Sequence, residues 1–249
     1  MCGRISLAHI DWKTLRTYLA LTGLPEEIPP PRYNVAPSQD IPVVPNKAAR
    51  AVEFFRWGLV PHWAQDEAIG NKLINARSET LAEKPSFKQA LKKRRCVVIA
   101  DGFYEWAKIG KKKVPLHITK KSGEPLLLAG LWETWSHKDK PEAPPLHSCT
   151  IVTCAPNEMM KPIHNRMPVI IGHSNIDRWL SPDPLEPADA LPLLGPYPST
   201  ELTARALSDR VNSPTHDDPE VLSPIEQQSL FRDNDLEKLM NKIRKASGE

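Results

Sequence analysis

The second residue of the chain is a cysteine whose position suggests a specific chemistry. The sequence begins Met1-Cys2-Gly3-Arg4, and the small side chain of Cys2 should permit removal of Met1. Cys2 would then carry an α-amine with a reference pKa of about 7.7 to 8.0 beside a thiol of about 8.5, so both keep a reactive fraction near neutral pH. Such a 1,2-aminothiol can condense with an aldehyde to an imine and close through sulfur to a thiazolidine. This chemistry needs no metal and no cofactor.

The position of Cys2 does not establish this chemistry by itself. A cysteine near a chain terminus is more often an exposed or lightly buried thiol without a chemical role. Lipidation is disfavoured because no apolar segment precedes Cys2, and myristoylation would require glycine at position 2, whereas the glycine here is Gly3. The aminothiol therefore needs a second group that moves protons and a pocket that delivers the aldehyde.

Glu105 and His164 are candidates for proton transfer. Strand alternation in the aromatic segment 102–106 places Glu105 on the same face as Phe103 and Ala107, where apolar neighbours would raise its pKa toward neutrality. The alternative is an edge-strand glutamate that faces water. His164 lies in a loop and has a reference pKa of about 6.5, which suits a general acid or base, although a lone loop histidine is usually a surface residue.

Other polar and aromatic side chains could hold a sugar, a phosphate or a base. Asn34 and Asn75 suit a sugar hydroxyl or a carbonyl oxygen, with turn formation as the alternative. The ring of Trp63 could stack on a base, worth about 1 to 3 kcal/mol, or could lie in the core. Three arginines accompany these candidates, and their guanidinium groups fit phosphate: Arg4, Arg77 and Arg166.

The composition favours a loop-rich intracellular protein. The chain has 249 residues, of which 26 are prolines. This is about twice the number expected from an average usage of about 5%, and it disfavours a helical bundle. A net charge of +3 permits nucleic-acid binding without requiring it. No transmembrane run or secretory signal is visible, so we expect a reduced compartment, the cytoplasm, with nucleoid association in a bacterium.

The four cysteines do not predict a metal site or a disulfide framework. They form no C-x-x-C pair, and a chain of this length needs no disulfide to fold. Cys149 and Cys154 would point to opposite faces of a strand, which makes them poor metal partners. We therefore expect neither a metal nor a cofactor, and no association with a membrane.

The elements that must position these residues are mostly strands. The segment 71–79 is expected to be a polar loop or short strand. The pattern predicts a single α+β domain with a large mixed or antiparallel sheet flanked by short helices. Extended segments are expected at 41–44, 51–60, 96–100, 103–107, 114–119, 126–135, 148–153, 169–171 and 202–207.

Helix signals are fewer. Asp11 should cap a helix that Gly23 ends, Ser86 should cap a second helix, and Ser174 should begin a third that ends near Leu180. The basic runs 92–95 and 111–113 are typical of solvated surface, the second within a hairpin tip over 108–113.

The last segment, 226–249, is predicted to be a C-terminal amphipathic helical extension that is docked on the body or partly frayed. Asn234 and Glu237 would form a capping box. Behind them an apolar stripe lies on a basic helix and comprises Leu236, Leu239, Met240 and Ile243.

Six short clusters occur through the chain in a fixed order. They are MCGR at the start, then RYNVAP, WGLVPHW, INARSE, DGFYEW and HNRMP. Together they resemble the SOS response-associated peptidase (SRAP) family, the abasic-site shielding proteins. The resemblance runs from Met1 to about Ile225, so the predicted domain is 1–225 and the rest looks like an addition.

The resemblance implies a use for the aminothiol. Proteins of this family bind single-stranded DNA containing an abasic site, whose ring-opened sugar exposes an aldehyde at C1′. By matching motifs, Cys2 would form the crosslink, while Glu105 and His164 would transfer protons. Asn75 would position the sugar or Cys2. The residues implied to bind DNA near the lesion or along the base-stacking side are Arg4, Asn34, Pro37, Trp63, Arg77 and Arg166.

We therefore expect a monomeric DNA-damage protein that caps abasic sites in single-stranded DNA through a Cys2 thiazolidine. The resemblance further implies removal of Met1 by a peptidase activity and a strand-cleaving lyase side reaction. Two rival hypotheses stay open. A thiol peptidase would use Cys2 with His164 as base and would not need a free α-amine. A non-catalytic single-strand binding module would bind intact and abasic DNA equally.

Overall fold

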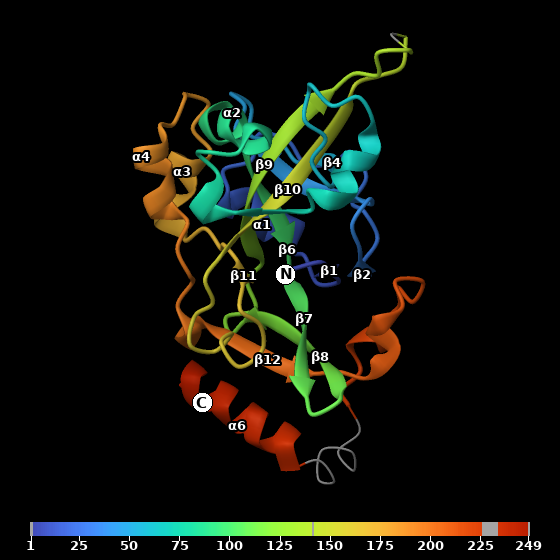
Figure 1. The fold of residues 1–249 in the computed structure, drawn as a ribbon, viewed down its shortest axis with the longest axis vertical. Coiled ribbons are helices and arrows are strands. Elements are labelled where there is room, and N and C mark those ends of the chain that lie inside the picture. Colours follow the sequence, from blue (N-terminus) through green and yellow to red (C-terminus); the bar gives the residue numbers. More distant parts are fainter. Residues whose placement is uncertain (1, 141, 226–233, 249) are drawn as a thin grey trace.

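The larger of two sheets closes on itself (Figure 1). The computed structural model describes residues 2–140, 142–225 and 234–248. The strands of this sheet are β3 (Asp40–Pro45), β4 (Glu53–Trp57), β5 (Asn75–Arg77), β6 (Arg95–Ala100), β9 (Leu126–Trp135), β10 (Leu146–Cys154) and β11 (Met167–Pro168). Their order is β11-β10-β4-β3-β6-β9, with β5 beside β10, and a further pairing of β9 with β10 joins the central strands into a barrel. Strand β6 is buried along its whole length, which explains its run of apolar residues.

The second sheet carries the start of the chain. Its strands are β1 (Ile5–Leu7), β2 (Arg32–Val35), β7 (Gly102–Ile109), β8 (Lys112–Lys120) and β12 (Leu202–Ala206), in the order β12-β8-β7-β1-β2. Gly110, with φ of 57°, and Lys111 form the two-residue turn between β7 and β8. Because β1 pairs with β7, the residues that precede β1 lie beside the middle of β7.

Short helices flank the two sheets. The helix α6 lies at the lower end of the molecule in Figure 1 and packs against β12. The α-helices are α1 (Trp12–Tyr18), α2 (Pro85–Lys93), α3 (Ile176–Trp179), α4 (Pro187–Ala190) and α6 (Asn234–Ser247). The 3₁₀ segments are Glu67–Lys72, Ser78–Thr80, His173–Asn175, Leu191–Leu193, Ser199–Glu201, Asp209–Asn212 and Pro219–Leu222. No helix in the described part of the chain has the length and apolarity needed to cross a bilayer.

The expected single α+β domain is confirmed, with the large sheet divided into two. The apolar stripe of α6 is docked on the body, since Leu236, Met240 and Ile243 are buried in the main core. The side chain of Asn234, and with it the predicted capping box, lies outside the described residues. The boundary at residue 225 stays a prediction.

The predicted helix ends were partly wrong. Asp11 caps α1 as expected, accepting hydrogen bonds from two backbone N–H groups. The helix nevertheless ends well before Gly23, because Ala20 adopts a left-handed backbone conformation with φ of 50°. Ser86 does not cap α2, because Pro85 occupies the first helical position and makes Lys84 the N-cap. The third helix is shorter than expected, with a 3₁₀ turn before α3.

The basic run 92–95 is not entirely solvated surface. Arg95 is fully buried, and its guanidinium saturates its donors with backbone carbonyl oxygens, which lets a cation lie inside the protein. Arg94 pairs with the buried carboxylate of Glu133. The carbonyl groups that accept from Arg95 belong to Leu91, Lys92, Trp179, Ser181 and Asp183. This run therefore ties α2 to the segment after α3.

Candidate active site at the start of the chain

The residue before β1 is joined to a distant strand. Cys2 is fully buried, and its backbone carbonyl oxygen accepts a hydrogen bond of 2.7 Å from Nδ2 of Asn75. Asn75 begins β5, which runs parallel to β10 in the barrel sheet. The hydrogen bond thus fixes the first residues of one sheet against the other sheet. The Oδ1 atom of Asn75 is buried and has no partner among the described residues.

Glu105 lies beside Cys2 in the middle of β7. Its side chain is 3% exposed and shares its strand face with Phe103 and Ala107, as the alternation predicted. The alternative of an edge-strand glutamate is wrong, because β7 lies between β1 and β8. Burial raises the pKa of Glu105, and the charge of nearby His164 acts against this shift. A buried carboxyl group of this kind keeps its proton to a higher pH than an exposed glutamate does.

The thiol of Cys2 holds its proton more strongly than the sequence indicated. Burial, followed by the charge of Glu105, raises the pKa of Cys2 well above its usual range. The expectation of an appreciable thiolate fraction near neutral pH is therefore wrong for the chain that retains Met1. The thiol must give its proton to a neighbouring base when it reacts, and Glu105 is close enough to affect its ionisation.

His164 is half-buried in the loop between β10 and β11. Its Nδ1 atom lies 3.0 Å from the backbone nitrogen of Arg166, which donates to it. Because Nδ1 accepts this bond, the neutral ring carries its proton on Nε2. The loop therefore orients the ring, and the charge of His164 favours the ionised form of Glu105.

The arginines of this region differ in how far they are engaged. The guanidinium of Arg166 is 14% exposed and binds both carboxylate oxygens of Glu79, at 2.6 and 2.9 Å. This hydrogen bond is the main reason that the pKa of Glu79 is lowered. Arg166 also donates to the carbonyl of Thr153 at 2.6 Å. Arg77 is exposed at the end of β5. DNA binding by either arginine stays a prediction.

Arg4 and Asn34 hold each other. The Arg4 guanidinium donates to Oδ1 of Asn34 at 2.5 Å and to the carbonyl of Val211 at 2.9 Å. Asn34 is fully buried, and its Nδ2 atom donates to three carbonyl groups of the segment 211–216. The structure therefore gives Asn34 a role in holding this segment. Its predicted contact with DNA stays a prediction.

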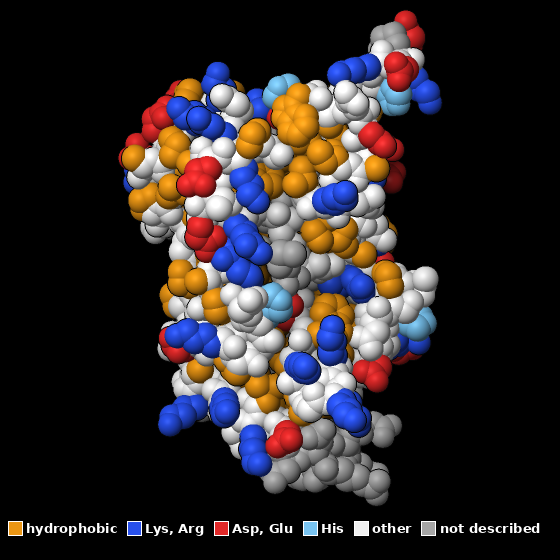
Figure 2. Space-filling model, in the orientation of Figure 1, with side chains coloured by type: hydrophobic (Ala, Val, Ile, Leu, Met, Phe, Trp, Pro, Cys, Tyr) orange, Lys and Arg blue, Asp and Glu red, His pale blue; other side chains and the backbone are white. Residues whose placement is uncertain are grey.

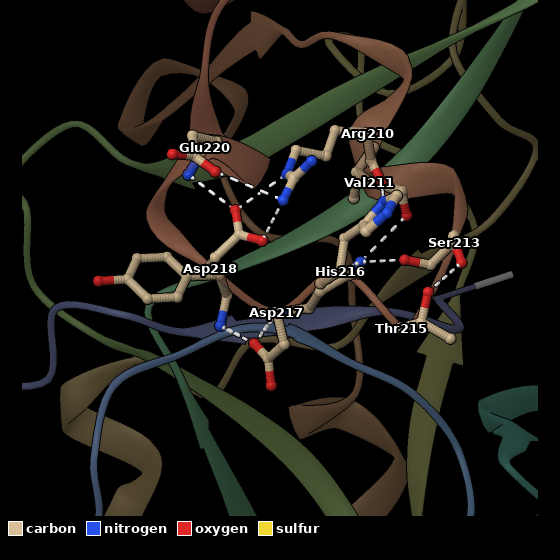
Figure 3. A network of polar contacts seen from close by, with 10 residues as sticks. Arg210, Val211, Ser213, Thr215, His216, Asp217, Asp218 and Glu220 are labelled. Atoms are coloured by element: carbon tan, nitrogen blue, oxygen red, sulfur yellow. Dashed lines mark hydrogen bonds and ion pairs between the residues drawn. The ribbon is translucent and has the colours of Figure 1, made fainter.

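The segment 209–220 is closed by its own polar network (Figure 3). Arg210 binds the carboxylate of Asp218 at 2.5 and 2.9 Å and lies 3.4 Å from Glu220. The neighbouring carboxylate of Asp217 accepts from the backbone nitrogen of Asn34 at 2.9 Å and pairs with Arg32. A late part of the chain is thereby fastened to β2, directly behind Arg4.

Of the predicted stacking residues, Trp63 is clearly placed at the surface. Its side chain is 46% exposed, so the alternative of a core position is wrong. Pro37 is half-buried after β2. Neither residue has a described contact with Cys2 or Glu105, so their roles also stay predictions.

Trp106 is a further residue near the candidate site, and its sequence context did not single it out. It follows Glu105 but faces the other side of β7, where its Nε1 atom donates to Oδ1 of Asn212 at 2.7 Å. The guanidinium of Arg4 lies 5.8 Å from the centre of its ring. The alternation that placed Glu105 also places Trp106 on the opposite, partly exposed face. Within the described residues there is no cluster of side chains that could hold a metal ion.

Known proteins resemble this chain over most of its length. The family model of the SOS response associated peptidase (SRAP) matches residues 1–214. The abasic site processing protein YoqW of Bacillus subtilis (strain 168) is 44% identical over 224 residues, which cover 89% of this chain and 99% of that protein. The abasic site processing protein HMCES of Xenopus tropicalis is 32% identical over 78% of this chain and 66% of its own length.

Solved structures agree with these sequence matches. A crystal structure of a protein from Bacteroides thetaiotaomicron is 28% identical and has a TM-score of 0.80, with 90% of this chain and 100% of that chain covered. The matched family region contains Cys2, Asn75, Glu105 and His164 and ends before α6. The resemblance seen in the six sequence clusters is confirmed: the chain belongs to the SOS response associated peptidase (SRAP) family.

Proposed function

We propose that this protein binds abasic sites in single-stranded DNA and captures them covalently through Cys2 after removal of Met1. The observation that carries the proposal is the meeting of Cys2 with Asn75 and Glu105 in one buried site. The substrate is suggested by the relatives, which are named abasic site processing proteins. An abasic sugar in its open form presents the aldehyde that an aminothiol needs.

The proposed reaction balances without an oxidant or a reductant. Hydrolysis of the Met1–Cys2 peptide bond consumes one water, releases methionine and frees the α-amine of Cys2. This amine adds to the C1′ aldehyde, and loss of one water gives an imine. The Sγ atom then bonds to C1′ while the thiol proton is transferred to nitrogen, which becomes the secondary amine of the thiazolidine ring.

Glu105 suits the proton transfers in this sequence. Its raised pKa keeps a proton available for the hydroxyl that leaves when the imine forms, and the resulting carboxylate can accept the proton of the Cys2 thiol. A base is needed at that step because burial holds the thiol in its protonated form. Asn75 holds the Cys2 carbonyl, and this limits the directions in which the amine and the thiol can point.

His164 has a separate part in the proposal. Its ring is oriented by the backbone nitrogen of Arg166, with the proton of the neutral ring on Nε2. We assign it the protonation of the sugar ring oxygen when the ring opens, and the reverse step when the crosslink is released. The exposed Arg77 would bind phosphate near the lesion, and this contact should weaken as salt is raised.

The experiment that tests the proposal is a crosslinking assay with intact mass measurement. Single-stranded DNA with one abasic site should give a product that survives denaturant, with the mass of protein lacking Met1 plus DNA minus one water. Cys2→Ala, or an extension retained ahead of Cys2, should abolish the product. A covalent product that persists in either variant would contradict the thiazolidine. Binding of intact and abasic DNA with equal affinity and no covalent product would support the single-strand binding module.

The proposal also covers the removal of Met1, a lyase side reaction, the oligomeric state and the cellular compartment. We assign Met1 removal to the same site, a lyase side reaction to the imine, and a monomer acting in the cytoplasm. Purified protein that starts with Met1 should lose 1 methionine with time, and Glu105→Gln should slow this loss. Retention of Met1 by the wild-type protein in the absence of an added aminopeptidase would contradict the self-directed reaction.

A further inference from the structure

A group of lysines at the end of the β7–β8 hairpin is not used by the site described above. All four side chains are exposed, and within the described residues none forms an ion pair with a carboxylate. Asp209 lines a shallow hollow together with two of them but pairs with neither. These residues, the hairpin lysines, are Lys108, Lys111, Lys112 and Lys113.

The arrangement of the hairpin lysines opposes folding. Lys108 lies directly opposite Lys113 in the pairing of β7 with β8, and like charges at such positions destabilise a sheet. The two-residue turn at Gly110 and Lys111 keeps the remaining cations close by. A solvated lysine needs no explanation, but a cross-strand lysine pair next to two further cations does. An anionic partner bound at the tip would offset this repulsion.

The hairpin extends directly from the candidate active site. At about 3.4 Å per residue, Lys108 lies about 10 Å along β7 from Glu105, and the turn that carries Lys111 lies just beyond Ile109, about 15 Å from Glu105. Trp106 and Lys108 share the face of β7 opposite to Glu105 by alternation, and the guanidinium of Arg4, two residues after Cys2, lies over the ring of Trp106 on that face. In Figure 1, β7 runs from the start of the chain to the hairpin tip, and Figure 2 shows Lys and Arg side chains over this lower part of the same face.

We propose that the hairpin lysines bind the phosphates of the DNA strand that extends from the lesion. The proposal rests on the proposed function, because capture at Cys2 is what fixes the start of the strand. With about 3.4 Å of rise per stacked nucleotide, the span from about 10 to about 15 Å places these contacts about three to four nucleotides from the abasic site. The hairpin thereby sets a minimum length of flanking DNA for full affinity.

Equilibrium binding tests this inference without the covalent step. The probe is fluorescent single-stranded DNA with one tetrahydrofuran abasic analogue, which cannot open to an aldehyde, flanked by two or eight nucleotides on each side in turn. The variant Lys111→Gln, Lys112→Gln, Lys113→Gln is compared with Lys84→Gln, Lys88→Gln, Lys93→Gln. The control changes the net charge equally on the exposed face of α2, at the opposite end of the molecule.

The hairpin variant should bind the long-flank DNA roughly tenfold more weakly at low salt. The slope of log K against log salt concentration should be less steep by about two, because three phosphate contacts are lost. The effect should vanish when the flank on one side is cut to two nucleotides, and the side at which it vanishes assigns the strand direction. The α2 control should bind like the wild-type protein. The crosslinking rate at saturating abasic DNA should be unchanged in both variants.

Three results would overturn the inference. They are equal losses in the hairpin variant and the α2 control, a loss that does not depend on flank length, and binding of vesicles of anionic phosphatidylglycerol in place of DNA. Failure of the proposed function would give a different set of results from failure of this inference. In that case no variant would give a covalent product, while the length-dependent binding of the tetrahydrofuran DNA would still report on the hairpin.

Discussion

The two faces of the β1–β7 region use polar side chains in opposite ways. On the barrel side, burial raises the pKa of both Glu105 and Cys2, so the protein surrounds these groups with an environment that disfavours their charged forms. On the other side, Arg4 and Asn34 meet the segment 209–220, where charges and amides are paired with protein partners. The same two strands therefore separate a site suited to proton transfer from a scaffold that holds it.

This difference gives a criterion for reading such sites. A buried group whose charge is disfavoured is a candidate for chemistry, whereas a group with saturated hydrogen bonds is a candidate for structure. Arg95 belongs to the second class: burial lowers its pKa to about 10, but its five donors all go to backbone carbonyl groups, so it is the saturated hydrogen bonding that separates it from Cys2.

The largest effect is expected on the barrel side. Glu105→Gln keeps the size of the side chain but removes its exchangeable proton, so the rate of covalent product should fall about a hundredfold or more. This corresponds to about 2.7 kcal/mol in the barrier. Single-turnover rates on denaturing gels between pH 5 and pH 8 would measure it. A Glu105→Gln rate within threefold of wild type across this range would remove Glu105 from the proton transfers.

On the scaffold side, loss of stability should exceed loss of rate. Asn34→Ala removes four hydrogen bonds of a buried side chain, one accepted from Arg4 and three donated to carbonyl groups, which should lower the free energy of unfolding by roughly 2 kcal/mol. Urea denaturation would measure it, with Asn212→Ala as the matched control at the more exposed bond to Trp106. If Asn34→Ala were as stable as the control but slower in crosslinking than Glu105→Gln, Asn34 would belong with the reactive residues.

How much of this arrangement could be predicted from the sequence differs between the two faces. The period of two along β7 was enough to place Glu105 with Phe103 and Ala107, because alternation is a local property. Local patterns also identified most of the strands. They could not show that β9 pairs with β10 to close a barrel, since this pairing joins segments through tertiary contacts.

The scaffold side escaped prediction because it depends on contacts between distant segments. The hydrogen bonds of Asn34 to residues 211–216 were not predicted, since an asparagine in isolation carries no sign that this segment will surround it. Arg95 was assigned to a solvated run because its neighbours are basic, although three of the five carbonyl groups that accept from it belong to the distant residues Trp179, Ser181 and Asp183. Hydrogen bonds over such separations leave no periodic pattern in the sequence.

Arg4 lies between the two faces, and a moderate effect is expected there. Arg4→Lys keeps the charge but loses the planar fork that contacts Asn34, Val211 and the ring of Trp106. If Arg4 positions the segment that carries Cys2, the maximal crosslinking rate at saturating DNA should fall about tenfold, or about 1.4 kcal/mol. If Arg4 binds DNA instead, the maximal rate should hold and the half-saturating DNA concentration should rise. A variant identical to wild type in both quantities would contradict both roles.

The smallest effect is expected on the free energy of unfolding, through the buried carboxyl group of Glu105. Because the pKa of Glu105 is raised above its usual 4.5, the folded protein binds the proton more tightly than the unfolded chain. Stability that depends on this proton is present below pH 4.5 and is lost as the pH rises through the raised pKa of Glu105. Glu105→Gln has no such ionisation, so its free energy of unfolding relative to wild type should increase over this window and stay higher, by on the order of 1 kcal/mol, at pH 8.

The exposed Glu83→Gln is the matched control and should show no such difference. A Glu105→Gln variant that is less stable than wild type at pH 8 would mean that the carboxylate is stabilised in place, and the distinction between the two faces would then fail at its central residue.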